Sequence, residues 1–203
     1  MTLKRAREVV ILALIIFTGG LVCAGQKGIG VHISGFSPDD DQTEQTFDVD
    51  SGPIPDVFFR YQTGHHSVVA GLGFQNWSRN QPSVSATAEL DFFPMFGSYR
   101  YAPWHGKPVS PFFGGGLGIL VYDATVESPS TLESETAALW ALEPVLGVEF
   151  LANRKVRLEI AAKYSWQIVS ADDLNLDLAF GEPLDVDMTG LYTTAGLVFM
   201  WGE

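Results

Sequence analysis

Basic residues and cysteine are scarce in this chain. The 203 residues contain 12 Lys and Arg against 24 Asp and Glu, and one cysteine, Cys23. Nucleic-acid binding requires an excess of Lys and Arg to neutralise phosphates, so this composition argues against nucleic acid as a partner. A single cysteine cannot form an intrachain disulfide, and the fold must therefore depend on packing and hydrogen bonding.

Long hydrophobic runs are also missing after the N-terminus, since no later stretch approaches the ~20 apolar residues of a transmembrane helix. The N-terminus itself differs. Lys4, Arg5 and Arg7 precede an apolar stretch that ends at Val22-Cys23-Ala24, which is the pattern of a secretory signal peptide. We therefore predict that residues 1–24 are a signal peptide cleaved after Ala24, and that residues 25–203 form one mature domain.

Two alternatives exist for this N-terminal segment. An uncleaved membrane anchor is disfavoured because the stretch is short and contains Gly19-Gly20. Lipidation of Cys23 is disfavoured because the residue before it is Val22 rather than a small one. Cleavage would remove the only thiol and leave 9 Lys and Arg against 23 Asp and Glu, a formal balance of −14.

The clearest pattern in the mature chain is a two-residue period over residues 156–168. One side of this segment is apolar, formed by Val156, Leu158, Ile160, Ala162, Tyr164, Trp166 and Ile168. The other side includes Arg157, Glu159, Lys163 and Gln167. Such alternation predicts a β-strand with one apolar and one polar face. Its length exceeds the ~5 to 6 residues of a usual globular strand and suits a tilted membrane-crossing strand of about ten.

The same period divides the mature chain into eight candidate strands, an even number that allows a closed antiparallel barrel. They lie near 28–36, 55–63, 66–77, 84–101, 110–122, 138–151, 156–168 and 188–201. On the fourth, the apolar face is expected to carry Ala88, Leu90 and Phe92, with Glu89 and Asp91 on the opposite face. Pro144 withholds a ladder hydrogen bond within the sixth, where we expect a bulge or a strand end beyond the bilayer.

The connections between these strands alternate in length and charge. Segments 37–53, 123–137 and 169–187 hold 6, 4 and 6 acids with no Lys or Arg, whereas most of the other connections are short. Long loops at one end and short turns at the other are typical of outer-membrane barrels. Aromatic residues of the apolar face also fall into two groups. We expect Phe59, Tyr61, Phe92, Phe150, Phe199 and Trp201 toward the short turns, and Phe74, Trp140, Tyr164 and Trp166 toward the long loops.

The polar faces would line a narrow interior. If Phe150 lies opposite Val156, Glu149 faces Arg157 and Glu143 faces Lys163, which would satisfy these charges. Further interior members of this network are expected to be His32, Arg60, Glu89, Asp91 and Glu159. Side chains usually fill an eight-stranded barrel, which disfavours a diffusion pore.

The chain resembles the small OmpA/OmpX-like outer-membrane β-barrel superfamily. The resemblance rests on Pro111-Phe112-Phe113-Gly114-Gly115-Gly116-Leu117-Gly118, on the hairpin from Leu146 to Tyr164, and on the final strand with Leu197, Phe199 and Trp201. It implies an all-β, eight-stranded, up-and-down transmembrane barrel in the cell outer membrane, in contact with outer-membrane lipid and lipopolysaccharide and inserted by the barrel-assembly machinery. Gly202 and Glu203 depart from the pattern, because many family members end on the aromatic residue.

Two other functions compete with this interpretation. A soluble lipocalin-like barrel would place the apolar face inside and bind a hydrophobic ligand. An outer-membrane enzyme acting on envelope lipid would need a nucleophile and a base, and His65 with Ser67 is the one candidate pair. The predicted lumen position of this pair, at the turn end, does not suit attack on lipid. We therefore expect no catalytic, cofactor or metal site.

The sequence thus predicts a non-catalytic barrel with a structural, surface-interaction or envelope-maintenance role. An extracellular partner could bind the acidic loops.

Overall fold

The computed structural model describes residues 25–39, 52–81, 86–128, 131–153, 155–169 and 188–202. Residues 1–24, on which the signal-peptide prediction rests, lie outside this set. The strands are β1 (Gln26–Pro38), β2 (Ile54–Thr63), β3 (His66–Gly73), β4 (Gln75–Gln81), β5 (Ala86–Tyr101), β6 (Val109–Ser128), β7 (Thr131–Leu151), β8 (Val156–Val169) and β9 (Gly190–Trp201). No helix in these ranges is long and apolar enough to cross a membrane.

The strands form a closed antiparallel barrel. β3 and β4 both pair with β5 in one register, with Leu72 opposite Met95 and Gln75 opposite Phe92, and together they make one barrel strand. The hydrogen-bonded order runs β3, β2, β1, β9, β8, β7, β6, β5, and the β3–β5 pairing closes the ring. The prediction of a single eight-stranded up-and-down barrel is confirmed.

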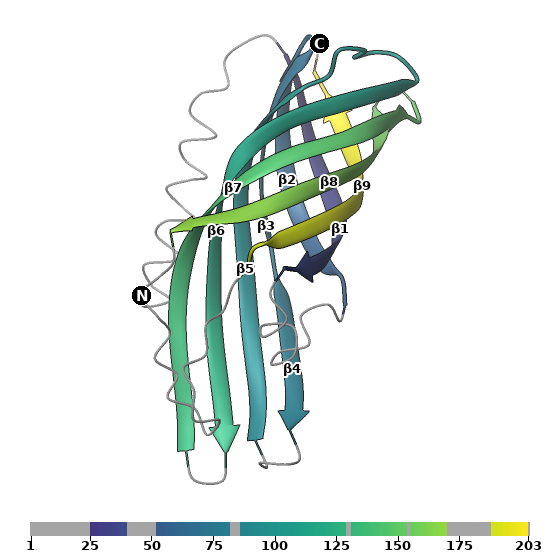
Figure 1. Cartoon of the computed structure of the whole chain (residues 1–203). Helices are drawn as coiled ribbons and strands as arrows, with labels where there is room; N and C mark the ends of the chain where they lie inside the picture. The colour runs from purple at the N-terminus through teal and green to yellow at the C-terminus, as the bar shows by residue number, and fades with distance from the viewer. Residues whose placement is uncertain are drawn as a thin grey trace.

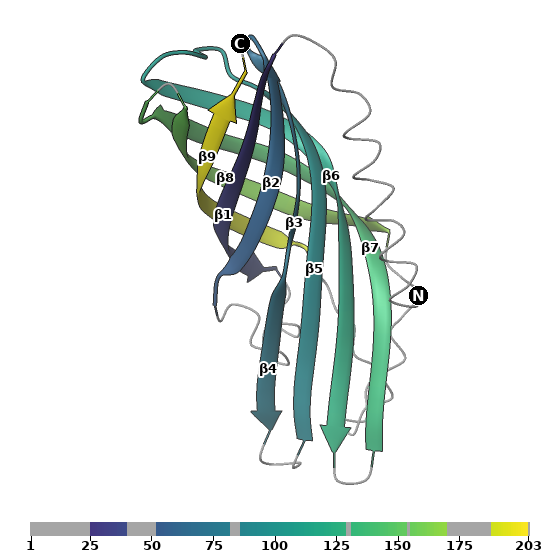
Figure 2. The same cartoon turned by 180° about the vertical axis from the view of Figure 1, so that it is seen from behind.

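The barrel has two different ends. We call the end that carries the short connections at 64–65, 102–108 and 152–155 the turn end, and the opposite one the loop end. Figure 1 shows that β4, β5, β6 and β7 continue past the other strands at the loop end, and Figure 2 shows these four side by side from behind. We call this extension the projecting sheet. Segments 123–128 and 131–137, expected to be part of a loop, belong to it, because β6 and β7 pair up to Ser128 and Thr131.

A belt of apolar side chains surrounds the barrel. Ile29 is 56% exposed and Ile160 is 58% exposed, and the belt also includes Val31, Ile33, Val57, Leu72, Phe113, Leu117, Leu146, Leu158, Leu197 and Phe199. Large exposed apolar surfaces on this scale fit a lipid environment rather than water. The soluble lipocalin-like alternative is therefore wrong for the barrel, since its apolar face points outward.

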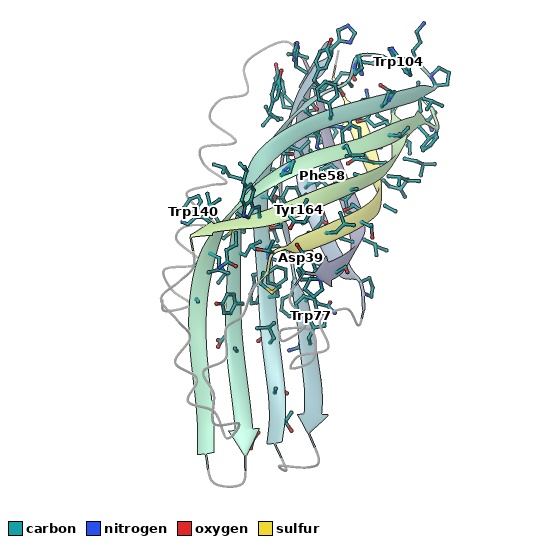
Figure 3. All side chains as sticks on the ribbon, in the orientation of Figure 1. Asp39, Phe58, Trp77, Trp104, Trp140 and Tyr164 are labelled. Carbon is teal, nitrogen blue, oxygen red and sulfur yellow. The ribbon has the colours of Figure 1, made fainter. Side chains whose placement is uncertain are left out.

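The projecting sheet has the opposite polarity. Across β4, β5, β6 and β7 a row of polar residues, Asn76, Asp91, Asp123 and Thr136, lies on the outer face in direct register. The inner face carries a buried apolar core formed by Trp77, Ala88, Leu90, Phe92, Leu120, Tyr122, Ala124, Ala137 and Leu139, with further residues from β1, β2 and β9. Figure 3 places Trp77 on this extension. The projecting sheet is thus built like a water-soluble sheet, apolar inside and polar outside.

This reversal corrects the expectation for β5. Leu90 and Phe92 are fully buried on the inner face, whereas Glu89 is exposed and Asp91 half-buried on the outer face. Glu89 and Asp91 therefore do not join the lumen network, and Phe92 belongs to the loop-end core rather than to an aromatic group at the turn end. The inner face is apolar here because the neighbouring strands enclose a core at this height instead of a charged lumen.

Two details of β7 also differ from expectation. Phe150 lies opposite Leu158 rather than Val156, so Glu149 lies directly opposite Glu159. Pro144 stays within β7 and pairs with Gly115 of β6. The register shift between β7 and β8 occurs between Trp140 and Ala141 instead. Pro144 keeps its place opposite Gly115 of β6, whereas the pairing of β7 with β8 is interrupted at Glu143 and Pro144, as expected for a residue without an N–H.

Candidate functional site in the barrel lumen

Glu159 of β8 is the centre of a charged cluster inside the barrel. Its side chain is 1% exposed, and Oε1 accepts a hydrogen bond of 2.6 Å from Nη1 of Arg100 on β5. Nη2 of Arg60, on β2, lies 3.6 Å from the other carboxylate oxygen. Three strands that are distant in sequence thus meet at one carboxylate. A buried carboxylate requires such partners, because its isolated charge is costly in a low-dielectric interior.

Glu149 forms the second centre of the cluster, directly opposite Glu159 on the neighbouring strand β7. It pairs with Arg60, and its Oε2 accepts a 3.0 Å hydrogen bond from Nη1 of Arg157. Arg157 also donates to Oε1 of Gln62 at 2.6 Å and to Oε1 of Gln26 at 2.9 Å. The predicted Glu149–Arg157 pair is confirmed. It forms as a diagonal contact, which long side chains can make despite the different strand register.

His32 extends the cluster toward the loop end. Its Nδ1 lies 3.0 Å from Oδ1 of Asp56, and its Nε2 lies 3.4 Å from Glu159. The ring stacks on Phe58 with the centroids 4.0 Å apart. Glycine opposite the ring is required here, because a Cβ at Gly196 would lie 2.2 Å from Cδ2 of His32.

The second predicted pair lies on the loop-end side of the lumen. Nζ of Lys163 donates to Oε1 of Glu143 at 3.0 Å, as the sequence predicted. The ammonium also lies 5.0 Å from the ring centre of Phe96 and 4.5 Å from that of Tyr192, within cation–π range. Buried apolar residues such as Phe58, Val69, Phe112 and Val198 pack in the interior around these charges.

The lumen is therefore filled by paired charges and packed side chains. Apart from His32, four cations, Arg60, Arg100, Arg157 and Lys163, face four carboxylates, Asp56, Glu143, Glu149 and Glu159. Among the described residues, these side chains occupy the interior at this height, as is usual for an eight-stranded barrel. The sequence prediction included His32, Arg60 and Glu159 but missed Arg100. The alternation of Ser98 and Arg100 with Tyr99 and Tyr101 was the available signal.

The candidate catalytic residues His65 and Ser67 are not brought together. Ser67 is buried on the inner face of β3, whereas His65 is exposed in the turn before it. Nδ1 of His65 lies 2.9 Å from the carbonyl oxygen of Ala102, and the amide of Ala102 donates to the carbonyl of His65 at 2.8 Å. This arrangement fastens the turn to the start of the 102–108 connection and does not direct the imidazole at the serine hydroxyl.

Metal ligands do not cluster in the described part of the chain. Within the ranges given above, no group of three or more His, Cys, Asp or Glu is arranged to hold a metal ion. The carboxylates of the Glu149 and Glu159 centres are already engaged by guanidinium groups.

The fold is shared with proteins of known structure. OprG from Pseudomonas aeruginosa aligns at 17% identity over 89% of this chain and 97% of its own, with a TM-score of 0.63. A major outer membrane protein from Thermus thermophilus aligns at 10% identity over 88% and 100% of the two chains, with a TM-score of 0.58. Ail of Yersinia pestis, in complex with the heparin analogue sucrose octasulfate, aligns at 13% identity over 88% and 100%, with a TM-score of 0.54.

No protein-family model and no curated protein matches the sequence. At these identities the structural matches establish the fold and not the activity. The closed ring of eight strands, the outward apolar belt and these structural neighbours agree with one another. The chain therefore has the fold of the small OmpA/OmpX-like outer-membrane β-barrels.

Proposed function

We propose that the chain is a non-catalytic integral protein of the Gram-negative outer membrane that displays the projecting sheet at the cell surface. The observation that carries this proposal is the change of polarity along β4 to β7. The barrel is apolar outside, as lipid requires, and the projecting sheet is polar outside, as water requires. The turn end, with its short connections, would then face the periplasm.

A structural or surface-interaction role fits this architecture better than transport. The charged cluster around Glu149 and Glu159 closes the lumen, and the apolar core of the projecting sheet closes the region above it. A sheet with its own core can present its outer face at a fixed height above the membrane. The belt would contact lipid and lipopolysaccharide, and β9, which ends in Phe199 and Trp201, would be read by the barrel-assembly machinery.

The charge of the projecting sheet restricts its partners. Glu89 and Glu127 are exposed on its outer face, and the whole chain carries a formal charge of −12. Ail was crystallised with a polyanion, but an acidic surface repels such a ligand. We expect any macromolecule that binds the projecting sheet of this chain to be basic. An enzyme acting on envelope lipid is not supported, because His65 and Ser67 are separated.

Fractionation with heat-dependent gel mobility is the first test. Closed membrane barrels often stay folded in detergent until heated, so the protein should be found in the outer membrane and should migrate differently before and after boiling. Recovery in the soluble periplasm without a mobility change would contradict the proposal. Planar-bilayer recording should then show no steady conductance, whereas a stable open channel would exclude a closed structural barrel.

Surface labelling tests the orientation. Single cysteines would replace Glu127 on the projecting sheet and Lys107 at the turn end, in a protein whose Cys23 is replaced by serine. A membrane-impermeant maleimide added to intact cells should label the Glu127→Cys variant and leave the Lys107→Cys variant unlabelled until the cells are lysed. The reverse result would place the turn end outside.

A further inference from the structure

A small hollow lies at the turn end of the barrel, between Glu149 and the 102–108 connection. It is partly open to solvent, has a cavity volume of about 20 Å³, and is lined by residues of the 102–108 connection and of β6, β7 and β8. The side chains that matter for its chemistry are His105, Lys107, Ser110 and Arg157. Arg157 belongs to the Glu149 centre, whereas His105, Lys107 and Ser110 have no ion pair with either centre, and the sequence prediction included the Glu149–Arg157 pair but no binding site here.

Two buried hydrogen-bond donors of this hollow have no partner. Ser110 is 3% exposed, and its hydroxyl makes no hydrogen bond. Arg157 is 6% exposed, and its Nε–H is likewise unpaired, although Nη1 and Nη2 are engaged by Glu149, Gln62 and Gln26. Buried donors are nearly always satisfied in folded proteins, by protein groups, by water or by a ligand, and both of these residues line the same hollow.

His105 supplies a further donor. Its Nδ1 lies 2.8 Å from Nε2 of Gln62, and the orientation of this amide is set by Arg157, which donates to Oε1 of Gln62. The Gln62 NH₂ group therefore donates to Nδ1. In the neutral imidazole the proton must then be on Nε2, which makes that atom a donor.

The local charge favours an anion. Of the charged side chains that line the hollow, Lys107 and Arg157 are cations and Glu149 is an anion. Glu149 lines the hollow, but its two oxygens are already paired with Arg60 and Arg157. The lining thus carries one more cation than anion, and two of its donors are unpaired.

We propose that this hollow binds one oxyanion group, the carboxylate or phosphate of a small molecule that enters from the turn end. Its oxygens would accept hydrogen bonds from the Ser110 hydroxyl and the Arg157 Nε–H. Lys107 and His105 would close the site around them. Charge-assisted hydrogen bonds to oxyanions are among the strongest polar contacts that a small site can make. The proposal does not depend on which side of the membrane the turn end faces.

The test is an NMR titration of the detergent-solubilised mature protein, monitored at the backbone amides of Gly106, Lys107 and Ser110. Inorganic phosphate, acetate and chloride are added separately at matched ionic strength. Phosphate or acetate should shift these resonances saturably while chloride does not. Saturation with phosphate alone would assign a phosphoryl ligand, and saturation with acetate alone a carboxylate ligand. A non-saturating response, or an equal response to chloride, would overturn the proposal.

Variants with matched controls complete the test. Ser110→Ala should weaken affinity about tenfold, since a hydrogen bond to a charged group is lost. The control, Ser165→Ala, removes another buried unpartnered hydroxyl, remote from the hollow on β8, and should leave affinity unchanged. Lys107→Gln should weaken affinity about threefold, with Lys155→Gln as its control. The proposal fails if the Ser110→Ala and Lys107→Gln variants still show heat-modifiable mobility and bind phosphate and acetate as tightly as the parent protein does. The anion would then bind elsewhere, and only water would occupy the hollow.

Discussion

Phe92 and Phe93 are consecutive residues of β5 whose rings lie in different surroundings. Phe92 is fully buried in the core of the projecting sheet, 5.5 Å from the ring centre of Trp77. Phe93 is 42% exposed on the outer face, 4.8 Å from the ring centre of Phe74. Between these two residues the apolar side of the sheet changes from the outer to the inner face. On β5, the apolar belt therefore ends at Phe93 on its loop-end side.

Leu90 tests whether the projecting sheet has its own core. Leu90→Ala should lower the free energy of unfolding by about 2–5 kcal/mol, because it leaves a cavity among fully buried neighbours. Leu72→Ala, on the lipid-facing side of β3, should cost less, since lipid can fill the space. Urea unfolding in lipid vesicles measures both. Equal losses would mean that the projecting sheet has no packed interior.

The strands could be predicted from sequence because alternation is a local property. Each barrel strand keeps apolar residues on one side for the height of the membrane, and this is visible in Val156 to Ile168 without knowledge of any partner. The change of apolar side on β5 is also visible in the sequence. Apolar residues alternate up to Phe92, and a second alternation, shifted by one residue, begins at Phe93. The prediction assumed instead that one face of the strand stays apolar throughout.

Partner choice within the lumen was harder to predict because it depends on register. The Glu149–Arg157 pair was predicted with Phe150 opposite Val156, yet the strands pair two residues away and the contact is diagonal. Arg100 was missed because its strand passes Pro94 and Gly97, where the alternation is weak. The hollow at the turn end depends on the 102–108 connection, whose path no periodicity describes.

Glu159 should be essential for the lumen network. Glu159→Gln removes the charge that compensates Arg100 and Arg60, and leaving buried cations uncompensated should cost about 3–5 kcal/mol of unfolding free energy. Glu89→Gln changes an exposed carboxylate on the outer face and should change stability by less than about 0.5 kcal/mol. Urea midpoints from heat-modifiability gels would compare the two. A Glu159→Gln variant as stable as the parent would show that the cluster is not a stabilising unit.

Gly196 should be intolerant of a side chain. In Gly196→Ala the new Cβ would overlap the His32 ring and the carbonyl oxygen of Val31, so the ring must leave its stack on Phe58 and the two strands must shift, at a cost of about 1–3 kcal/mol. Gly115→Ala is the matched control, because its Cβ meets no atom nearer than 3.9 Å. Thermal unfolding in detergent should separate the two variants, and identical melting would place His32 elsewhere.

Ile160 tests the lipid-facing belt. Ile160→Arg places a cation near the middle of β8 on the outer face and should cost about 2–4 kcal/mol in a bilayer. Thr136→Arg places the same side chain on the exposed outer face of the projecting sheet and should cost little. Assembly into phospholipid vesicles, followed by gel mobility, measures the difference. Equal assembly of both variants would argue that lipid does not contact Ile160.

His105 connects stability with pH. Burial, together with the nearby positive charge of Arg157, lowers the pKa of His105 below its usual value. Because the folded-state pKa lies below the unfolded one, the stabilisation is present above the unfolded pKa and is lost as the pH falls through the folded pKa. His105→Gln should flatten this part of the pH profile of the urea midpoint. Phosphate bound in the hollow would oppose the Arg157 charge and favour the protonated imidazole. The parent protein should therefore lose less stability on acidification in phosphate than in chloride, and equal losses would argue against an anion beside His105.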